Sequence, residues 1–431
     1  MGDPVRFDSG RAADLPRQAP VARPQADPGA PVPRVPAIDL LRGLAVMGMI
    51  MVAYAGGWDH RFTFLTHADW RGFAIADMIF PAFLFCAGAA LPYALRRRAG
   101  RGRTALVGHV LRRAAALVVL GIVLNLLPGF DFAHVRLPGI LQRIGLCYAI
   151  VGTGCVLALR RDGLSVAAPV AAIVALLVGY AALLLAWDAP GCGRACFDSA
   201  HALPAVVDRA VFGVPHLWPW GRTGDLVTYD PEGLVATLGA LVNVLFGVTA
   251  SVLLMRSHRR ATLTALAIAG AACLLAGFLL DPLVPVVKKL WTPSFALLSG
   301  GFTLLALLAL MRLVPPGRAA PAWARPILAF GTNATAAFVG ISLLDTLLQL
   351  PLGGAGSGHD LLAGWLAGGC DPGGAGRVGR VFGLAAGRAG CRTLATVPQA
   401  YRHQAVNGRI LDDFPVCQSC GRPDELTWRQ Q

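Results

Sequence analysis

Residues 164–186 read LSVAAPVAAIVALLVGYAALLLA, a run of 23 residues without a charged side chain. At about 1.5 Å per residue, roughly 20 such residues span the hydrocarbon core of a bilayer as a helix. The run is continuous rather than alternating, which argues against a strand of a membrane β-barrel. It therefore predicts a transmembrane α-helix.

Eight other segments share this length and character. They lie at approximately 38–56, 76–95, 106–127, 138–159, 234–254, 262–280, 291–311 and 327–349. Over the whole chain of 431 residues, 55% are hydrophobic and 14% are charged. A soluble protein of this size could not bury so much apolar surface, and soluble domains carry roughly a quarter charged residues. The sequence predicts an all-α, polytopic transmembrane helix bundle of about 9–10 spans.

The arginines decide the expected orientation. They gather in the connections after the second, fourth, sixth and eighth segments, which fall on one side if the segments alternate. The positive-inside rule makes that side the cytoplasm. We therefore expect a multi-pass protein of the inner (plasma) membrane with a cytoplasmic N-terminus. The net charge of +14 is then explained without nucleic-acid binding. The chain also has no cluster of aromatic and basic residues of the kind that binds nucleic acids.

The two ends of the chain differ from its hydrophobic middle. Residues 1–36 are rich in Pro, Arg and Asp and predict a disordered cytoplasmic tail. Residues 37–350 form the expected transmembrane domain. After Pro351 the chain becomes rich in Gly and Arg, so residues 351–431 predict a tail that is poorly ordered or aberrant.

The ten cysteines are scattered, four of them inside apolar segments, and do not form a disulfide framework. One close pair, Cys192 and Cys196 in CGRAC, lies in the long connection 187–233. A disulfide can persist there outside the cytoplasm, so the bridged and reduced states are both open. A single CxxC at 417–420 has no second pair, and we expect no metal site.

Ionisable groups inside membrane helices are costly and are functional candidates by default. Asp39 and Arg42 begin the first segment three residues apart, close enough to pair. They are interpreted first as an end anchor or an ion pair that locks the fold, with substrate binding as the alternative. Gln142 and Arg143 begin the fourth segment in LPGILQRIG. Arg143 would bind a phosphate or carboxylate, or pair with an acid on another helix.

Further polar residues are candidates for substrate or cofactor binding. Glu232 and Asn243 are eleven residues apart, about three helical turns, and would share one face of the sixth segment. Lys289, beside Lys288 in VKKLWTPS, would attract an anionic ligand or lipid headgroups before the eighth segment. Asn333, in FGTNATAAF, is a candidate for a buried amide that either packs helices together or contacts a ligand.

His67 lies in THADWRGFAIADMIFP just before the second segment, two residues from Asp69 and ten from Asp77. A neutral imidazole can accept a proton from an attacking amine or hydroxyl, and a nearby carboxylate can fix its tautomer. The structural alternatives are an interfacial histidine beside Trp70 and an aspartate that caps a helix. His67, Asp69 and Asp77 are the candidate catalytic residues. Walker, GxSxG and HExxH motifs do not occur, and the chain has no Rossmann fingerprint in the required context of a strand followed by a helix.

Six stretches of the chain together resemble one known family. They are IDLLRGLAVMGMIMV, HADWRGFAIADMIFPAFLFCAG, LPGILQRIGLCYAI, YDPEGLVATLGALVNVLFGV, PVVKKLWTPSFAL and FGTNATAAF, between residues 35 and 350. In this order they are similar to the heparan-α-glucosaminide N-acetyltransferase family and its bacterial transmembrane relatives. The resemblance implies a multi-span acyltransferase that moves an acetyl group from cytoplasmic acetyl-CoA to an amino sugar or related glycan across the membrane. It places the reactive histidine of the H-A-x-W-x-G block at His67.

The chain departs from the family pattern in two places. Many relatives carry Asn in the M-x-x-V-N stretch of the first span, where this chain has Ala53. Relatives also continue with one or more final spans, whereas this chain becomes rich in Gly and Arg after Pro351. Both departures leave the activity open, and a transporter or permease for a small sugar or amino sugar is the alternative function. Besides the acceptor and the lipid bilayer, a homodimer is left open as a partner.

Overall fold

The structure is a computed structural model, and it describes residues 35–53, 66–98, 100–127, 129–161, 163–315 and 320–349. The α-helices are α1 (Pro36–Ala53), α2 (Ile79–Arg96), α3 (Arg103–Leu126), α4 (Ile140–Leu157), α5 (Ala167–Ala186), α6 (Leu203–Phe212), α7 (Thr237–Arg256), α8 (Arg259–Leu280), α9 (Pro293–Leu313), α10 (Ala324–Thr332) and α11 (Ala334–Gln349). The short elements are the 3-10 helices η3 (Ile75–Met78) and η4 (Val214–His216) and the strands β1 (Asp188–Ala189), β2 (Gly193–Arg194), β3 (Arg222–Thr223) and β4 (Leu226–Val227). The predicted C-terminal tail 351–431, with its CxxC motif, and residues 1–34 of the N-terminal tail lie outside the described residues.

The expected all-α membrane bundle is confirmed. Within the described ranges, seven helices are long and apolar enough to cross a membrane, and an eighth span results if α10 and α11 count as one. The predicted continuous helix over 327–349 is wrong, because α10 and α11 meet at an angle of 83°. Asn333 lies between them with a non-helical backbone (φ −113°, ψ 27°), and its side-chain amide donates to the carbonyl of Ala329. Asparagine often ends helices in this way by bonding to nearby backbone.

Burial sorts the helices into central and peripheral ones. The share of the residues in a helix's apolar stretch that are buried inside the bundle is 72% for α7, 67% for α9 and 61% for both α2 and α4. It is only 22% for α3 and α5 and 17% for α8. α2 and α7 approach so closely that a methyl group on Gly88 would overlap the carbonyl of Val244, and one on Gly247 would overlap that of Phe85. Small residues that bring backbones together are typical of helix packing in lipid. The two central helices α2 and α7 therefore pack closely against each other and hold the side chains near their ends in fixed positions.

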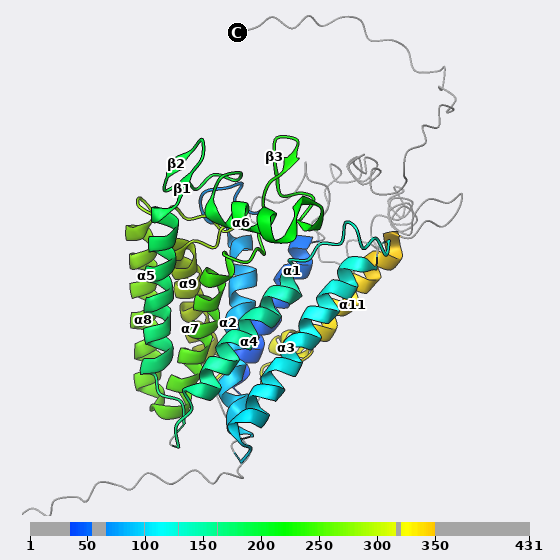
Figure 1. The fold of residues 1–431 in the computed structure, drawn as a ribbon. Coiled ribbons are helices and arrows are strands. Elements are labelled where there is room, and N and C mark those ends of the chain that lie inside the picture. The colour runs from blue at the N-terminus through cyan, green and yellow to red at the C-terminus, as the bar shows by residue number, and fades with distance from the viewer. Residues whose placement is uncertain are drawn as a thin grey trace, which may run out of the picture. The chain divides into compact units, whose positions relative to one another are not determined.

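The connections between helices gather at two ends of the bundle (Figure 1). At one end, here called the arginine end, Arg103 donates to the carbonyl of Leu159 over 3.0 Å and Arg259 donates to that of Met311 over 3.2 Å. These contacts join four of the helix termini that the sequence assigned to one side. Each contact brings together two of the arginine-rich connections, as the sequence predicted.

The other end, here called the insert end, carries the strands and α6 (Figure 1). The insert is the segment 187–233, in which β1 pairs with β2 and β3 pairs with β4 as short antiparallel hairpins. Cys192 and Cys196 form a disulfide beside the first hairpin, which resolves the alternative that the sequence left open. The segments that precede α2 and α9 lie at this end, where the N–H of Gly72 donates to the carbonyl of Val286 over 2.9 Å.

Candidate active site

His67 is held by a buried carboxylate at the insert end. Its Nδ1 lies 2.8 Å from Oδ1 of Asp77, whose side chain is fully buried, whereas 42% of the His67 side chain is exposed. The other oxygen of Asp77 accepts the N–H of Ala74 over 2.9 Å, so that Asp77 caps η3 and orients the imidazole at once. A carboxylate that accepts the Nδ1 proton leaves Nε2 as the basic nitrogen.

Lys288 completes this group from the segment before α9. Its Nζ lies 3.1 Å from Oδ1 of Asp77 and 2.9 and 3.3 Å from the two ring nitrogens of His67. Burial lowers the pKa of Lys288, and the negative charge of Asp77 works against that effect. We call His67, Asp77 and Lys288 the imidazole group.

Lys289, the lysine that we selected from sequence, lies beside this group instead of in it. Its ammonium donates to the backbone carbonyl of Asp69 and lies over the rings of Trp70 and Tyr229, 5.5 and 5.6 Å from their centroids. Burial lowers the pKa of Lys289. Of the two predicted aspartates, Asp77 pairs with His67, while Asp69 contributes its backbone carbonyl to the neighbouring lysine.

A second charged group surrounds Arg136, a residue that sequence reasoning missed. Arg136 donates to both oxygens of Asp230 over 2.8 and 2.6 Å and also to Glu232. Burial would lower the pKa of Arg136, but the carboxylates of Glu232 and Asp230 outweigh burial and raise it. The charge of Glu232 also acts on Lys288, so this group adjoins the imidazole group. The partners of Arg136 lie 94 and 96 residues away along the chain, and no local pattern could have identified them.

The predicted common face of Glu232 and Asn243 is wrong. α7 begins at Thr237, and Glu232 lies in the turn before it. That turn forms because Asp230 accepts the N–H of Glu232 over 2.9 Å. Asn243 is fully buried, accepts the indole N–H of Trp291 over 2.8 Å and donates to Ser299 over 3.1 Å. These contacts favour a helix-packing role for Asn243.

Arg143 lies in the first turn of α4 and is 2% exposed. It donates to the carbonyl of Gly233 over 3.0 Å, and its guanidinium lies 5.0 Å from the ring centroid of Trp291. Within the described part of the chain, its Nε and Nη1, and Nε2 of Gln142, are buried without a hydrogen-bond partner. Burying a donor without a partner costs free energy of folding. The two unpaired nitrogens of Arg143 are therefore available to donate to a further acceptor.

The remaining predicted residues lie around a cavity inside the bundle. Asp39 and Arg42 form the expected ion pair at 3.2 Å, and Arg42 also donates to the carbonyl of Gly331 over 3.0 Å. Arg42, Arg113 and Asn333 line a cavity of about 350 Å³ between α1, α2, α3, α4 and the break of α10 and α11. Asn333 is exposed, so the expected buried amide is wrong: it lies at the break between α10 and α11, on the wall of this cavity.

Asp208 of α6 is a buried carboxyl group that no sequence pattern indicated. It is fully buried, and its Oδ1 accepts the N–H of Leu234 over 2.8 Å. Its Oδ2 packs against Gly233, where any side chain would overlap it, and has no hydrogen-bond partner among the described residues. Burial raises the pKa of Asp208 to about 7.

This raised pKa predicts a pH dependence of stability. The folded value of about 7 lies above the ordinary 3.8, so the folded protein keeps a proton that the unfolded chain has released in this window. The contribution to stability is full below about pH 4 and is lost as pH rises through about 7, with an upper limit of about 4 kcal/mol. We expect the melting temperature of the purified protein to fall over this window.

Asp208→Asn keeps the acceptor for Leu234 and does not titrate, so it should flatten this dependence. Asp225→Asn is the matched control, because Asp225 is exposed between β3 and β4. It should retain the wild-type slope. A wild-type slope in Asp208→Asn would assign the dependence to another group.

Comparison with known proteins shows similarity to one family. Residues 34–192 match the family model described as heparan-alpha-glucosaminide N-acetyltransferase, catalytic. The chain is 28% identical over 328 residues to heparan-alpha-glucosaminide N-acetyltransferase of Homo sapiens, and 27% identical over 329 residues to that of Mus musculus. Each alignment covers 65% of this chain and 49% of the relative, so the chain spans about half the length of the curated relatives it matches. The matched segment carries His67, Asp77 and Arg143, so this part of the chain is similar to the heparan-alpha-glucosaminide N-acetyltransferase family.

Proposed function

We propose that the chain is a membrane acyltransferase that moves an acetyl group from acetyl-CoA to the amine of an amino sugar or related glycan. The observation that carries this proposal is the imidazole group, in which a half-exposed His67 is oriented by buried Asp77 and contacted by Lys288. The names of the two relatives support the acceptor class. We place the arginine end in the cytoplasm of the inner membrane, with the N-terminus, and the imidazole group on the opposite side.

His67 acts as a general base in this proposal. Nε2 takes a proton from the acceptor amine as its nitrogen attacks the thioester carbonyl, and Asp77 holds the imidazole that becomes protonated. The N–C bond forms, the C–S bond breaks, and the proton on His67 passes to the departing thiolate of CoA. The ammonium of Lys288 is placed to stabilise negative charge on the carbonyl oxygen, as preorganised donors do in acyl transfer.

The cavity within the bundle suits the donor. Its lining runs from Arg42 and Tyr148, in the middle of α1 and α4, to Ile140 at the insert end of α4. Arg42 and Arg113 supply positive charge on walls that are otherwise mostly apolar, which fits a ligand with phosphates and a slender thiol arm. Bound acetyl-CoA would supply the activated acetyl group, and Arg42 and Arg113 would hold its phosphates.

The test is product formation across a sealed membrane. Vesicles that contain the chain are given acetyl-CoA on the arginine side and a panel of amino sugars on the insert side, and products are identified by mass spectrometry. We expect N-acetylated glucosamine, no product from glucose, and no product from vesicles that lack the chain. Sugar uptake without acetyl transfer would instead support the transporter. Labelling of residue 67 by an impermeant reagent from the cytoplasmic side would overturn the proposed orientation.

A further inference from the structure

The imidazole group is assembled from two separate segments of the chain. His67 precedes η3 and Lys288 precedes α9, and the two residues are 221 positions apart. Their side chains meet only if the two backbone segments are held in register. One tie is the 2.9 Å hydrogen bond from Gly72 to Val286. A second direct tie is the bond from Lys289 to the carbonyl of Asp69. A further connection runs through the insert.

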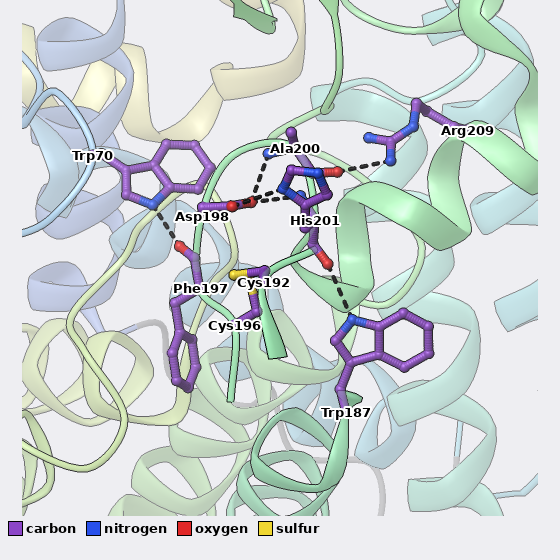
Figure 2. Close-up of a disulfide and its surroundings, with 9 residues drawn as sticks. All are labelled: Trp70, Trp187, Cys192, Cys196, Phe197, Asp198, Ala200, His201 and Arg209. Carbon is purple, nitrogen blue, oxygen red and sulfur yellow. Dashed lines mark hydrogen bonds and ion pairs between the residues drawn. A yellow bond between two sulfur atoms is a disulfide. The ribbon is translucent and has the colours of Figure 1, made fainter. Parts of the chain in front are cut away.

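Trp70 links the His67 segment to the insert. Its indole Nε1 donates to the carbonyl of Phe197 over 2.7 Å, as Figure 2 shows. The same indole lies edge-on to Tyr229, with ring centroids 5.0 Å apart. Trp70 is three residues from His67, so this hydrogen bond restrains the backbone that carries the imidazole.

Phe197 links the insert to the Lys288 segment. It is 6% exposed and belongs to a hydrophobic cluster that also contains Val284, Val287 and Leu290. Val287 directly precedes Lys288. Phe197 thus accepts a hydrogen bond from one segment through its carbonyl and shares a buried cluster with residues of the other segment.

The backbone of Phe197 is itself restrained from both directions (Figure 2). Cys196, which precedes it, is 4% exposed and forms the disulfide with Cys192. Asp198, which follows it, accepts the N–H of Ala200 over 3.0 Å and so fixes the turn toward α6. A carbonyl between two such restraints presents a fixed acceptor to Trp70.

We propose that Trp70 and Phe197 are positioning residues that hold His67 against Lys288, and that the Cys192–Cys196 disulfide keeps Phe197 in place. This inference rests on the proposed function for its effect on turnover. The position of His67 can be measured without that function.

The decisive comparison uses two indoles. Trp70→Phe keeps the aromatic ring and removes the donor to Phe197. Trp187→Phe is the matched control, because Trp187 donates to another carbonyl of the insert, that of His201, over 3.0 Å (Figure 2). Both changes remove one indole hydrogen bond to the insert, and only the first acts on the His67 segment.

The first readout is the rate at which diethyl pyrocarbonate modifies His67 in the full chain, followed by mass spectrometry of that peptide. We expect Trp70→Phe to raise this rate about five-fold, the factor that one hydrogen bond of ordinary net strength makes in an equilibrium. Trp187→Phe should leave it at the wild-type value. Equal rates in the two variants would overturn the inference, whether or not acetyl transfer is ever detected.

The second readout is turnover. Trp70→Phe should lower kcat by a similar factor and leave KM for acetyl-CoA unchanged, because the donor cavity is lined by other segments. A purely structural loss would lower the amount of active protein and leave the modification rate of His67 in the folded fraction unchanged. If no variant and no wild-type protein transfers acetyl groups, the proposed function fails and the modification rates still decide this inference.

The disulfide is tested by the paired variant Cys192→Ser with Cys196→Ser. It should raise the modification rate of His67, and a reductant should bring the wild-type protein to the same rate without further effect on the variant. Reduction of folded wild-type protein keeps the test valid if the paired variant fails to fold. An unchanged rate after reduction of this bond would show that Phe197 is held without it.

Discussion

Replacing His67 with alanine is expected to abolish measurable acetyl transfer, with a fall in kcat of about 10²–10⁴-fold. The imidazole supplies the general base, and a methyl group cannot accept the proton of the acceptor amine. Stability should change little, because 42% of the His67 side chain is exposed and Asp77 and Lys288 remain paired at 3.1 Å. Initial rates at saturating acetyl-CoA and glucosamine, normalised to folded protein, measure the effect.

The control for this variant is another histidine with the same kind of partner. His134 lies 2.8 Å from Asp131 with both side chains exposed, so His134→Ala removes an equivalent pair outside the imidazole group. It should keep the wild-type rate. Retention of more than half the activity in His67→Ala would contradict the assignment of His67. Radiolabelled acetyl left on His67 without acceptor would replace the general-base route with an acyl-histidine route.

The spans could be predicted because the bilayer imposes one strict requirement on them. In lipid, the backbone N–H and C=O groups of a segment without charges, such as 164–186, must form hydrogen bonds within the protein. A helix forms these bonds within the segment itself. Each predicted segment overlaps a helix of the structure for this reason. The break at Asn333 escaped prediction because its FGTNATAAF context is apolar enough for a continuous helix. At the break, the side chain of Asn333 bonds to the carbonyl of Ala329 and to the hydroxyl of Thr332.

The candidate site was predictable where its residues lie close together along the chain. His67 and Asp77 are ten residues apart, and their pairing was anticipated. Lys288 and Lys289 are adjacent, and sequence could not tell which one turns toward the imidazole. Arg136 depends on partners more than ninety residues away, which only the fold brings together.

The largest expected effect on stability comes from Arg136→Ala. The change leaves Asp230, which is fully buried, and Glu232, which is 12% exposed, without their shared counter-charge. Removing one partner of a buried ion pair costs about 3–5 kcal/mol, because the remaining charge stays buried and uncompensated. The variant also loses the guanidinium that lies 5.7 Å from the ring centroid of Trp218. Thermal and denaturant unfolding of the purified protein in detergent measure the loss.

Two further variants separate lost charge balance from lost side-chain volume. Adding Asp230→Asn to Arg136→Ala removes the uncompensated buried charge, so the double variant should recover part of the stability. Arg194→Ala is the matched control, because Arg194 pairs with Asp188 at 3.9 Å with both side chains largely exposed. Such pairs contribute about 1 kcal/mol at most. If Arg136→Ala costs no more than Arg194→Ala, the Arg136 group does not support the insert end. The turn that carries Glu232 would then be held without Arg136, by the bond from the N–H of Glu232 to the side chain of Asp230.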